Sequence, residues 1–262
     1  VGAAIGGVFA SVFGRDAAFI ANAVSFALAA IMFASVRQPM QMTREKSAVN
    51  QRIRPIADMR EALVHARRDP VLLALIFSKT TFAIGAGVVS QLAVLASDVF
   101  KGGDSSRGLL IAARGVGAVL GPLLAAGYTG GDINKVLKVC GISSLIFSGC
   151  YLIGAWMPAL ILTAVFITIA HLGGGAQWTL STYGLQLRSP DHVRGRILAG
   201  DFALVTLTLS VTSALAGIAS ELLGVRQAIS VFAIAAALAS VVYIKAIQRL
   251  RNLPQPQINA EP

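Results

Sequence analysis

The stretch LALIFSKTTFAIGAG, Leu73 to Gly87, is apolar or small almost throughout, yet it holds Lys79 in its middle. The fold depends on whether this run belongs to a soluble core or crosses a membrane. Of the 262 residues, 55% are hydrophobic and only 13% are charged, whereas soluble domains carry roughly 25% charged residues. The long apolar runs also lack the polar face that a surface helix of a soluble protein needs. The composition therefore predicts an all-α integral membrane protein.

Seven apolar runs have the length of a membrane span, which is about 20 residues. Each should be a helix, because a segment in lipid must satisfy its own backbone hydrogen bonds. The opening stretch 1–13 is too short to span, has no initiating Met and lacks the features of a signal peptide. We expect it to be the end of a helix that begins earlier, in a longer protein. The seven runs cover residues 17–36, 70–97, 106–127, 136–156, 158–184, 197–222 and 226–246.

The connections between these runs differ sharply in positive charge. Alternate connections together hold sixteen Lys and Arg residues, and those between them hold four. Because basic residues mark the cytoplasmic side, this predicts a multi-pass protein of the inner (plasma) membrane with the long polar connection 37–69 and the C-terminus in the cytoplasm. Most of the charged residues behind the formal charge of +10 lie in these connections, which argues against a nucleic-acid partner. Residues 55–70 predict an amphipathic helix, either at the membrane boundary or as a solvated linker.

Three motifs carry a resemblance to a known family. They are GAAIGG at 2–7, SPDHVRGR at 189–196 and the glycine-rich ARGVGAVLGPLLAAG at 113–127. With these residues the chain resembles the exporter branch of the major facilitator superfamily, which includes enterobactin-exporter-like and macrolide-efflux-like proteins. Gly2, Gly6 and Gly7 match the antiporter motif of that family's fifth helix, although Ala3 replaces its proline. The second motif resembles the loop between helices ten and eleven through Pro190, Arg194, Gly195 and Arg196.

The resemblance implies the C-terminal portion of a twelve-helix transporter, with the missing N-terminal half as its partner. Residues 1–36 would be a remnant of the N-terminal bundle, comprising the end of helix five and helix six. Residues 37–69 would form the central cytoplasmic loop, 70–246 the C-terminal six-helix bundle and 247–262 a cytoplasmic tail. In this fold the substrate binds at the midplane between the two bundles.

Four ionisable residues lie well within the spans: Lys79, Arg114, His171 and Asp201. A charge at the bilayer centre costs at least about 2.5–3.5 kcal/mol on insertion scales, so such residues usually face protein or water. They fall on the runs that the resemblance matches to helices seven, eight, ten and eleven, the cavity-lining helices of the family. We predict that Lys79, Arg114 and His171 line a net-positive pathway for anionic or polar amphiphilic substrates.

Each of these residues also has a purely structural interpretation. Lys79 would form an ion pair or extend toward the boundary, and Arg114 would extend outward in the same way. His171 would be a neutral histidine that is hydrogen-bonded between helices. Asp201 would be a proton-linked switch or the partner of an inner cation, or else a structural partner of Arg194 or Arg196.

Two further pathway candidates follow His171 on the same run. Gln177 offers hydrogen bonds, and Trp178 offers a ring that can stack on a ligand or pack against other helices. Before them, Gly173 to Gly175 indicate either close helix packing or a local hinge.

The sequence thus predicts a secondary active transporter, a proton-coupled exporter of a small polar or amphiphilic molecule of siderophore or drug type. Two alternatives stay open: a non-transporting membrane receptor or sensor on the same fold, and a truncated fragment without activity. No P-loop, zinc-ligand spacing or Ser-His-Asp set occurs, so we expect no enzymatic activity, no cofactor and no metal. The expected partners are a small-molecule substrate and the lipid bilayer.

Overall fold

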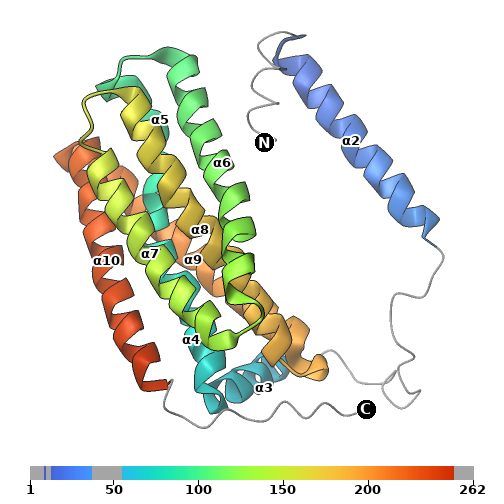
Figure 1. The fold of residues 1–262 in the computed structure, drawn as a ribbon. Helices are drawn as coiled ribbons and strands as arrows, with labels where there is room; N and C mark the ends of the chain where they lie inside the picture. The colour runs from blue at the N-terminus through green and yellow to red at the C-terminus, as the bar shows by residue number, and fades with distance from the viewer. Residues whose placement is uncertain (1–8, 10–12, 37–54, 251–262) are drawn as a thin grey trace.

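The structure is a computed structural model that describes residues 9, 13–36 and 55–250. Seven of its helices are long and apolar enough to cross a membrane, and they correspond to the seven predicted runs (Figure 1). The all-helical membrane fold predicted from composition is therefore confirmed for the described part of the chain. The motif residues Gly2, Gly6 and Gly7, the stretch 37–54 and the tail from 251 lie outside the described residues.

The first helix, α2 (Arg15–Ser35), is apolar along its whole length. None of the residues in its apolar window is buried against the rest of the described protein. Side chains such as Phe19, Phe26 and Phe33 are more than two-thirds exposed. This helix therefore presents its surface to lipid or to a partner outside the described residues.

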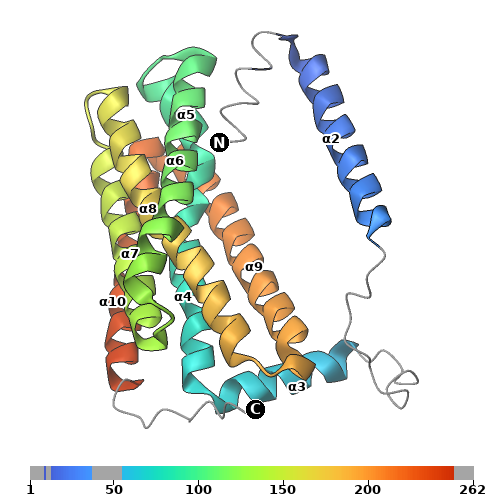
Figure 2. The ribbon, with the colours of Figure 1, turned by 45° about the vertical axis from the view of Figure 1, so that its right-hand side comes forward.

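Six antiparallel spans form one bundle, in which α8 lies between α6 and α7 and α10 packs against α7 and α4 (Figures 1 and 2). Its first span begins with α4 (Pro70–Ala86), whose first turn is capped by Asp69, a side chain that accepts a hydrogen bond of 3.0 Å from the Val71 amide. The other spans are α6 (Gly103–Thr129), α7 (Ile133–Gly154), α8 (Leu160–Arg188), α9 (Asp191–Leu223) and α10 (Val225–Leu250).

Glycines bring the helices on either side of α8 close to its backbone. A Cβ atom at Gly121 of α6 would lie 2.0 Å from the carbonyl oxygen of Leu172, and one at Gly173 of α8 would lie 2.5 Å from that of Ser143 on α7. Without a driving force between apolar helices in lipid, such close backbone packing supplies much of the association energy. The helix α8 is continuous through Gly173 to Gly175, so these glycines serve packing and form no unwound hinge.

The span predicted at 70–97 is not one regular helix. After α4 the chain continues as a 3₁₀ turn, η2 (Gly87–Gln91), a short α5 (Leu92–Val94) and a π-helical turn, η3 (Leu95–Val99). The change begins where a Cβ at Gly87 would lie 2.5 Å from the backbone of Thr212 on α9. Thr212 Oγ1 donates to the Ala83 carbonyl at 3.0 Å, which satisfies an oxygen at the end of the regular helix.

Two helices also extend beyond the approximate runs predicted for them. Residues Asp191 to Arg196 of the SPDHVRGR motif are the first turns of α9, so only Ser189 and Pro190 connect α8 to α9. At the C-terminal end, α10 continues to Leu250, past the predicted boundary at 246. Each helix extends beyond its apolar run, because charged side chains are compatible with a helix outside the lipid.

The predicted amphipathic helix is present as α3 (Pro55–Arg68), which packs against α9 and α4 (Figure 2). Ala62 and Ala66 are buried, and Leu63 is 47% exposed. Its Glu61 pairs with Arg196 of α9 at 2.8 Å. We call the end of the bundle that holds α3, the α8–α9 turn and the end of α10 the basic end.

The close contact of Gly121 with α8 predicts that the substitution Gly→Ala has opposite effects at two places on α6. Gly→Ala normally favours a helix by about 1 kcal/mol. At Gly121 the added methyl group meets the α8 backbone, so Gly121→Ala should instead lower stability by roughly 1–3 kcal/mol. At Gly108, where nothing lies within 4 Å of a Cβ, the same change should be neutral or stabilising. Thermal unfolding of the purified variants in detergent measures both, and equal shifts would show that α6 and α8 do not touch there.

Candidate functional site

A layer of polar side chains crosses the bundle between two apolar clusters. The cluster nearer the basic end includes Leu75, Leu137 and Ile197, and the other includes Phe82 and Phe147. Between these two clusters, five helices contribute buried polar residues. We call this group the polar belt. Its members are Ser78, Lys79, Thr81, Ser144, Gln177, Asp201 and Ser240.

The belt is joined by hydrogen bonds between helices. Ser240 Oγ donates to Ser144 Oγ at 2.7 Å, and the hydroxyls of Thr81 and Ser144 are 3.3 Å apart. Gln177 Nε2 of α8 donates to the backbone carbonyl of Ser78 on α4. In lipid these groups have no water to bind, so mutual pairing is what permits them there.

The charges of the belt are Lys79 on α4 and Asp201 on α9, which form an ion pair through Oδ2 of the carboxylate. Their side chains are only 4% and 3% exposed. Of the partners suggested for Asp201, an inner cation is therefore the one present, and Arg194 and Arg196 are not. Arg194 instead pairs with Asp191 at 2.6 Å.

The depth of the two side chains accounts for the pairing of Lys79 with Asp201. Lys79 is nine residues from the start of α4 at Pro70, or about 13 Å along the axis. Counted from Arg196, the last residue of the SPDHVRGR motif, Asp201 would lie only about 7 Å into its span. Since α9 begins at Asp191, Asp201 is ten residues in, or about 15 Å. With the correct helix start, the two charges lie at the same depth.

Trp178 of α8 lies next to both this ion pair and a cleft in the bundle. Its ring centroid is 5.4 Å from Lys79 Nζ, within the range of a cation–π interaction. The same residue lines the cleft. An aromatic ring therefore contacts the buried ammonium and also reaches the cleft.

This central cleft has a volume of about 520 Å³. Its lining comes from α4 with η2, from α6, from α8 and from α9, and no residue of α7 or α10 contributes. These are the four spans on which the buried ionisable residues were predicted to matter. Arg114, His171 and Trp178 are brought together in the lining, whereas Lys79, Gln177 and Asp201 lie in the belt and do not line it. Arg114 is the one exposed residue among these six candidates.

His171 fits the structural interpretation that was left open for it. Its Nε2 lies 2.9 Å from the hydroxyl of Tyr151 on α7, and both side chains are buried. The Phe147 ring meets the imidazole edge to face, with centroids 5.4 Å apart. Tyr151 and Phe147 were not predicted as site residues, because within an apolar run nothing distinguishes a tyrosine that orients a histidine from one that fills the core.

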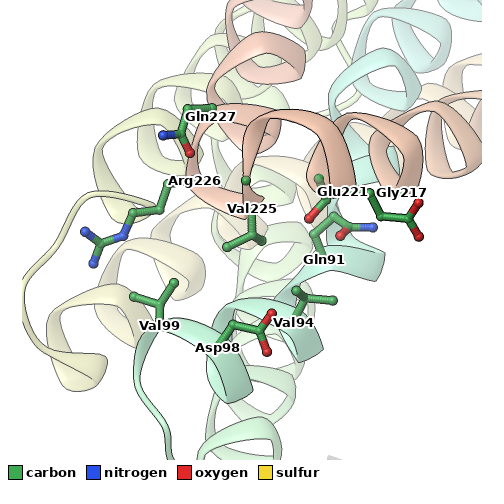
Figure 3. A pocket seen from close by; sticks show the side chains of 11 residues that line it. Gln91, Val94, Asp98, Val99, Gly217, Glu221, Val225, Arg226 and Gln227 are labelled. Atoms are coloured by element: carbon green, nitrogen blue, oxygen red, sulfur yellow. The ribbon is translucent and has the colours of Figure 1, made fainter.

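A second cleft of about 670 Å³ lies at the end of the bundle opposite the basic end (Figure 3). Asp98 and Glu221 line it and are exposed. Figure 3 shows Arg226 pointing away from both carboxylates, toward Met157, whose carbonyl accepts its hydrogen bond at 3.2 Å. Within the described residues, no group of three His, Cys, Asp or Glu side chains could hold a metal ion. The exposed Arg114 and the aromatic rings of its lining thus single out the central cleft as the candidate site.

Comparison with known proteins gives a family and one distant relative. The family model described as "Transmembrane secretion effector" matches residues 1–261. The chain is 22% identical over 229 residues to the "Staphyloferrin A transporter" of Staphylococcus aureus (strain NCTC 8325 / PS 47), a match that covers 83% of this chain and 54% of that protein. The chain thus spans about half the length of this relative. No solved structure gives a significant match.

The His171–Tyr151 contact predicts that Tyr151→Phe destabilises the protein. The change keeps the ring but leaves a buried imidazole nitrogen without its partner, which costs about 1–3 kcal/mol. Tyr183→Phe is the matched control, since Tyr183 is 41% exposed. Thermal unfolding in detergent should separate the two variants. If Tyr151→Phe unfolds like the control, the hydrogen bond does not hold α7 to α8.

Proposed function

The chain belongs to the transmembrane secretion effector family of the major facilitator superfamily, and from this premise we propose that it is part of a proton-coupled exporter of a small carboxylate-bearing amphiphile of siderophore type. The whole transporter would work by alternating access, with the basic end of the bundle in the cytoplasm. The described bundle would supply one wall of the substrate path, and the other half of the protein would supply the facing wall. Transport involves no covalent chemistry, so no enzymatic step is part of the proposal.

The observation that carries this proposal is the composition of the central cleft. An exposed guanidinium, Arg114, shares the cleft with the rings of Phe82 and Trp178. Guanidinium binds carboxylate through paired, charge-assisted hydrogen bonds, and aromatic rings cover the apolar body of a ligand. An anionic amphiphile satisfies both parts of this lining at once. The relative is named as a transporter of staphyloferrin A, which supports a siderophore as cargo.

The proton-coupling step is assigned to Asp201. Among the carboxylates of the described spans, it is the one within the interior, and its Oδ1 is buried without a hydrogen-bond partner. A proton on this carboxylate would cancel its attraction for Lys79. The ammonium would then depend on Trp178, the residue that also faces the cleft. Substrate contact with Trp178 and protonation of Asp201 would thus act on the same lysine.

Arg114 provides the sharpest test of the substrate class. In the full-length protein, Arg114→Gln should reduce export of a carboxylate-bearing fluorescent amphiphile by about tenfold or more, because a charge-assisted hydrogen bond is worth roughly 1.5–3 kcal/mol. Export of the amide twin of the same compound should be unchanged. Efflux from cells or vesicles measures both compounds, and Lys138→Gln, a charge change outside the cleft, is the control variant. Equal loss for the acid and the amide would exclude Arg114 as the carboxylate-binding group.

Asp201 is tested by separating substrate binding from transport. Asp201→Asn cannot release a proton, so export driven by a proton gradient should be lost while binding of the carboxylate probe in detergent is retained. Asp201→Glu restores the acid and should recover part of the export. Retention of gradient-driven export by Asp201→Asn would show that the coupling proton is carried elsewhere.

A further inference from the structure

An apolar groove runs between α4 and α10 on the outside of the bundle. Its volume is about 510 Å³, and residues such as Leu73, Phe77, Val242 and Ala246 line it. Phe77 is 52% exposed. At 3.6 residues per turn, Phe77 points to the side of α4 roughly opposite that of Phe82, which lines the central cleft. The groove therefore faces away from the substrate path and toward lipid.

The groove has the length of one lipid leaflet. On α4 its lining extends from Pro70 to Ile84, a distance of about 21 Å. On α10 it extends from Leu250 back to Ala239, or about 16 Å. Half of the bilayer's hydrocarbon core is about 15 Å thick. A chain that enters at the basic end would therefore end near the bilayer midplane.

Positive charges lie on the helices near the basic end of this groove. Lys245 and Arg249 on α10 each precede a lining residue directly, and Arg68 lies two residues before Pro70. All three are exposed. In the described part of the chain they take part in no ion pair. Basic side chains beside a groove between membrane helices are a recognised arrangement for binding acidic lipid head groups.

We propose that this groove binds an anionic phospholipid from the leaflet at the basic end. One acyl chain would lie along Phe77 and Val242, and the phosphate would rest against Arg249 and Lys245. The lining accounts for the chain and the basic side chains for the head group. The lipid would bridge α4, which carries Lys79 on another face, and α10. This site is independent of the proposed cargo and of proton coupling.

Native mass spectrometry of the purified full chain, released from nanodiscs of equal phosphatidylglycerol and phosphatidylcholine with matched acyl chains, tests the proposal. Phosphatidylglycerol should be retained at least about tenfold over phosphatidylcholine. Arg249→Gln together with Lys245→Gln should abolish that preference while the protein remains folded. Ala246→Phe, which fills the groove, should remove the retained lipid of either kind. Lys138→Gln takes away one charge at the same membrane boundary but outside the groove, and should change nothing.

Four results would overturn the proposal. Equal retention of both lipids would remove the charge argument, and an equal effect of Lys138→Gln and Arg249→Gln would show diffuse attraction without a site. Displacement of the lipid by soluble glycerol 3-phosphate as effectively as by intact phosphatidylglycerol would show that the groove holds no acyl chain. A second copy of the protein retained in place of lipid, and lost in Ala246→Phe, would identify the groove as a dimer contact.

Discussion

A hydrocarbon interior offers no water to a carbonyl, a hydroxyl or an ammonium, so each polar group in these spans must find its partner inside the protein. The polar belt shows how this is done. Ser240, Ser144 and Thr81 connect three helices through their hydroxyls, and Lys79 meets Asp201 on a fourth. An apolar cluster lies on either side of this layer. Glycines at the contacts of α8 with α6 and α7 bring the helix backbones near enough for short side chains to reach across.

The same constraint explains the shape of the candidate site. A buried ion pair is costly unless its geometry is good and its remaining polar atoms are satisfied. Here Oδ1 of Asp201 has no partner, and the nearest aromatic contact of Lys79 is the ring of Trp178. A pair that is incompletely satisfied and lies beside a cleft is suited to change partners. A structural pair would gain from complete hydrogen bonding, and this difference supports the proposed role of the belt in transport.

Much of the fold could be predicted because hydrophobicity and length are local properties. Each run long enough to cross the bilayer is helical, although the run at 70–97 is irregular after Ala86, and Pro55 to Arg68 form the expected amphipathic helix. Helix ends were harder to predict, since charged turns such as Asp191 to Arg196 continue a helix without an apolar signal. That error placed Asp201 too near the membrane boundary and so suggested Arg194 or Arg196 as its partner. The irregular turns after Ala86 depend on contact with Thr212, which is distant in sequence.

The candidate site was predictable in part for the same reason. Arg114 and Trp178 stood out as polar or amphipathic residues in apolar runs, and both line the cleft. Gln177 also stood out, but it is used inside the belt, and Tyr151 gave no signal at all. Which polar residue faces a cleft and which faces another helix is decided by packing between segments, so it does not follow from periodicity.

The pairing of Lys79 with Asp201 is the central claim, and a double-mutant cycle on unfolding in detergent tests it most directly. Lys79→Met or Asp201→Leu alone leaves an uncompensated buried charge and should cost about 3–5 kcal/mol. The double variant removes both charges and should be far more stable than the sum of the single changes predicts. Additive losses would mean that the two residues do not interact, and the link between the cleft and the polar belt would then be lost.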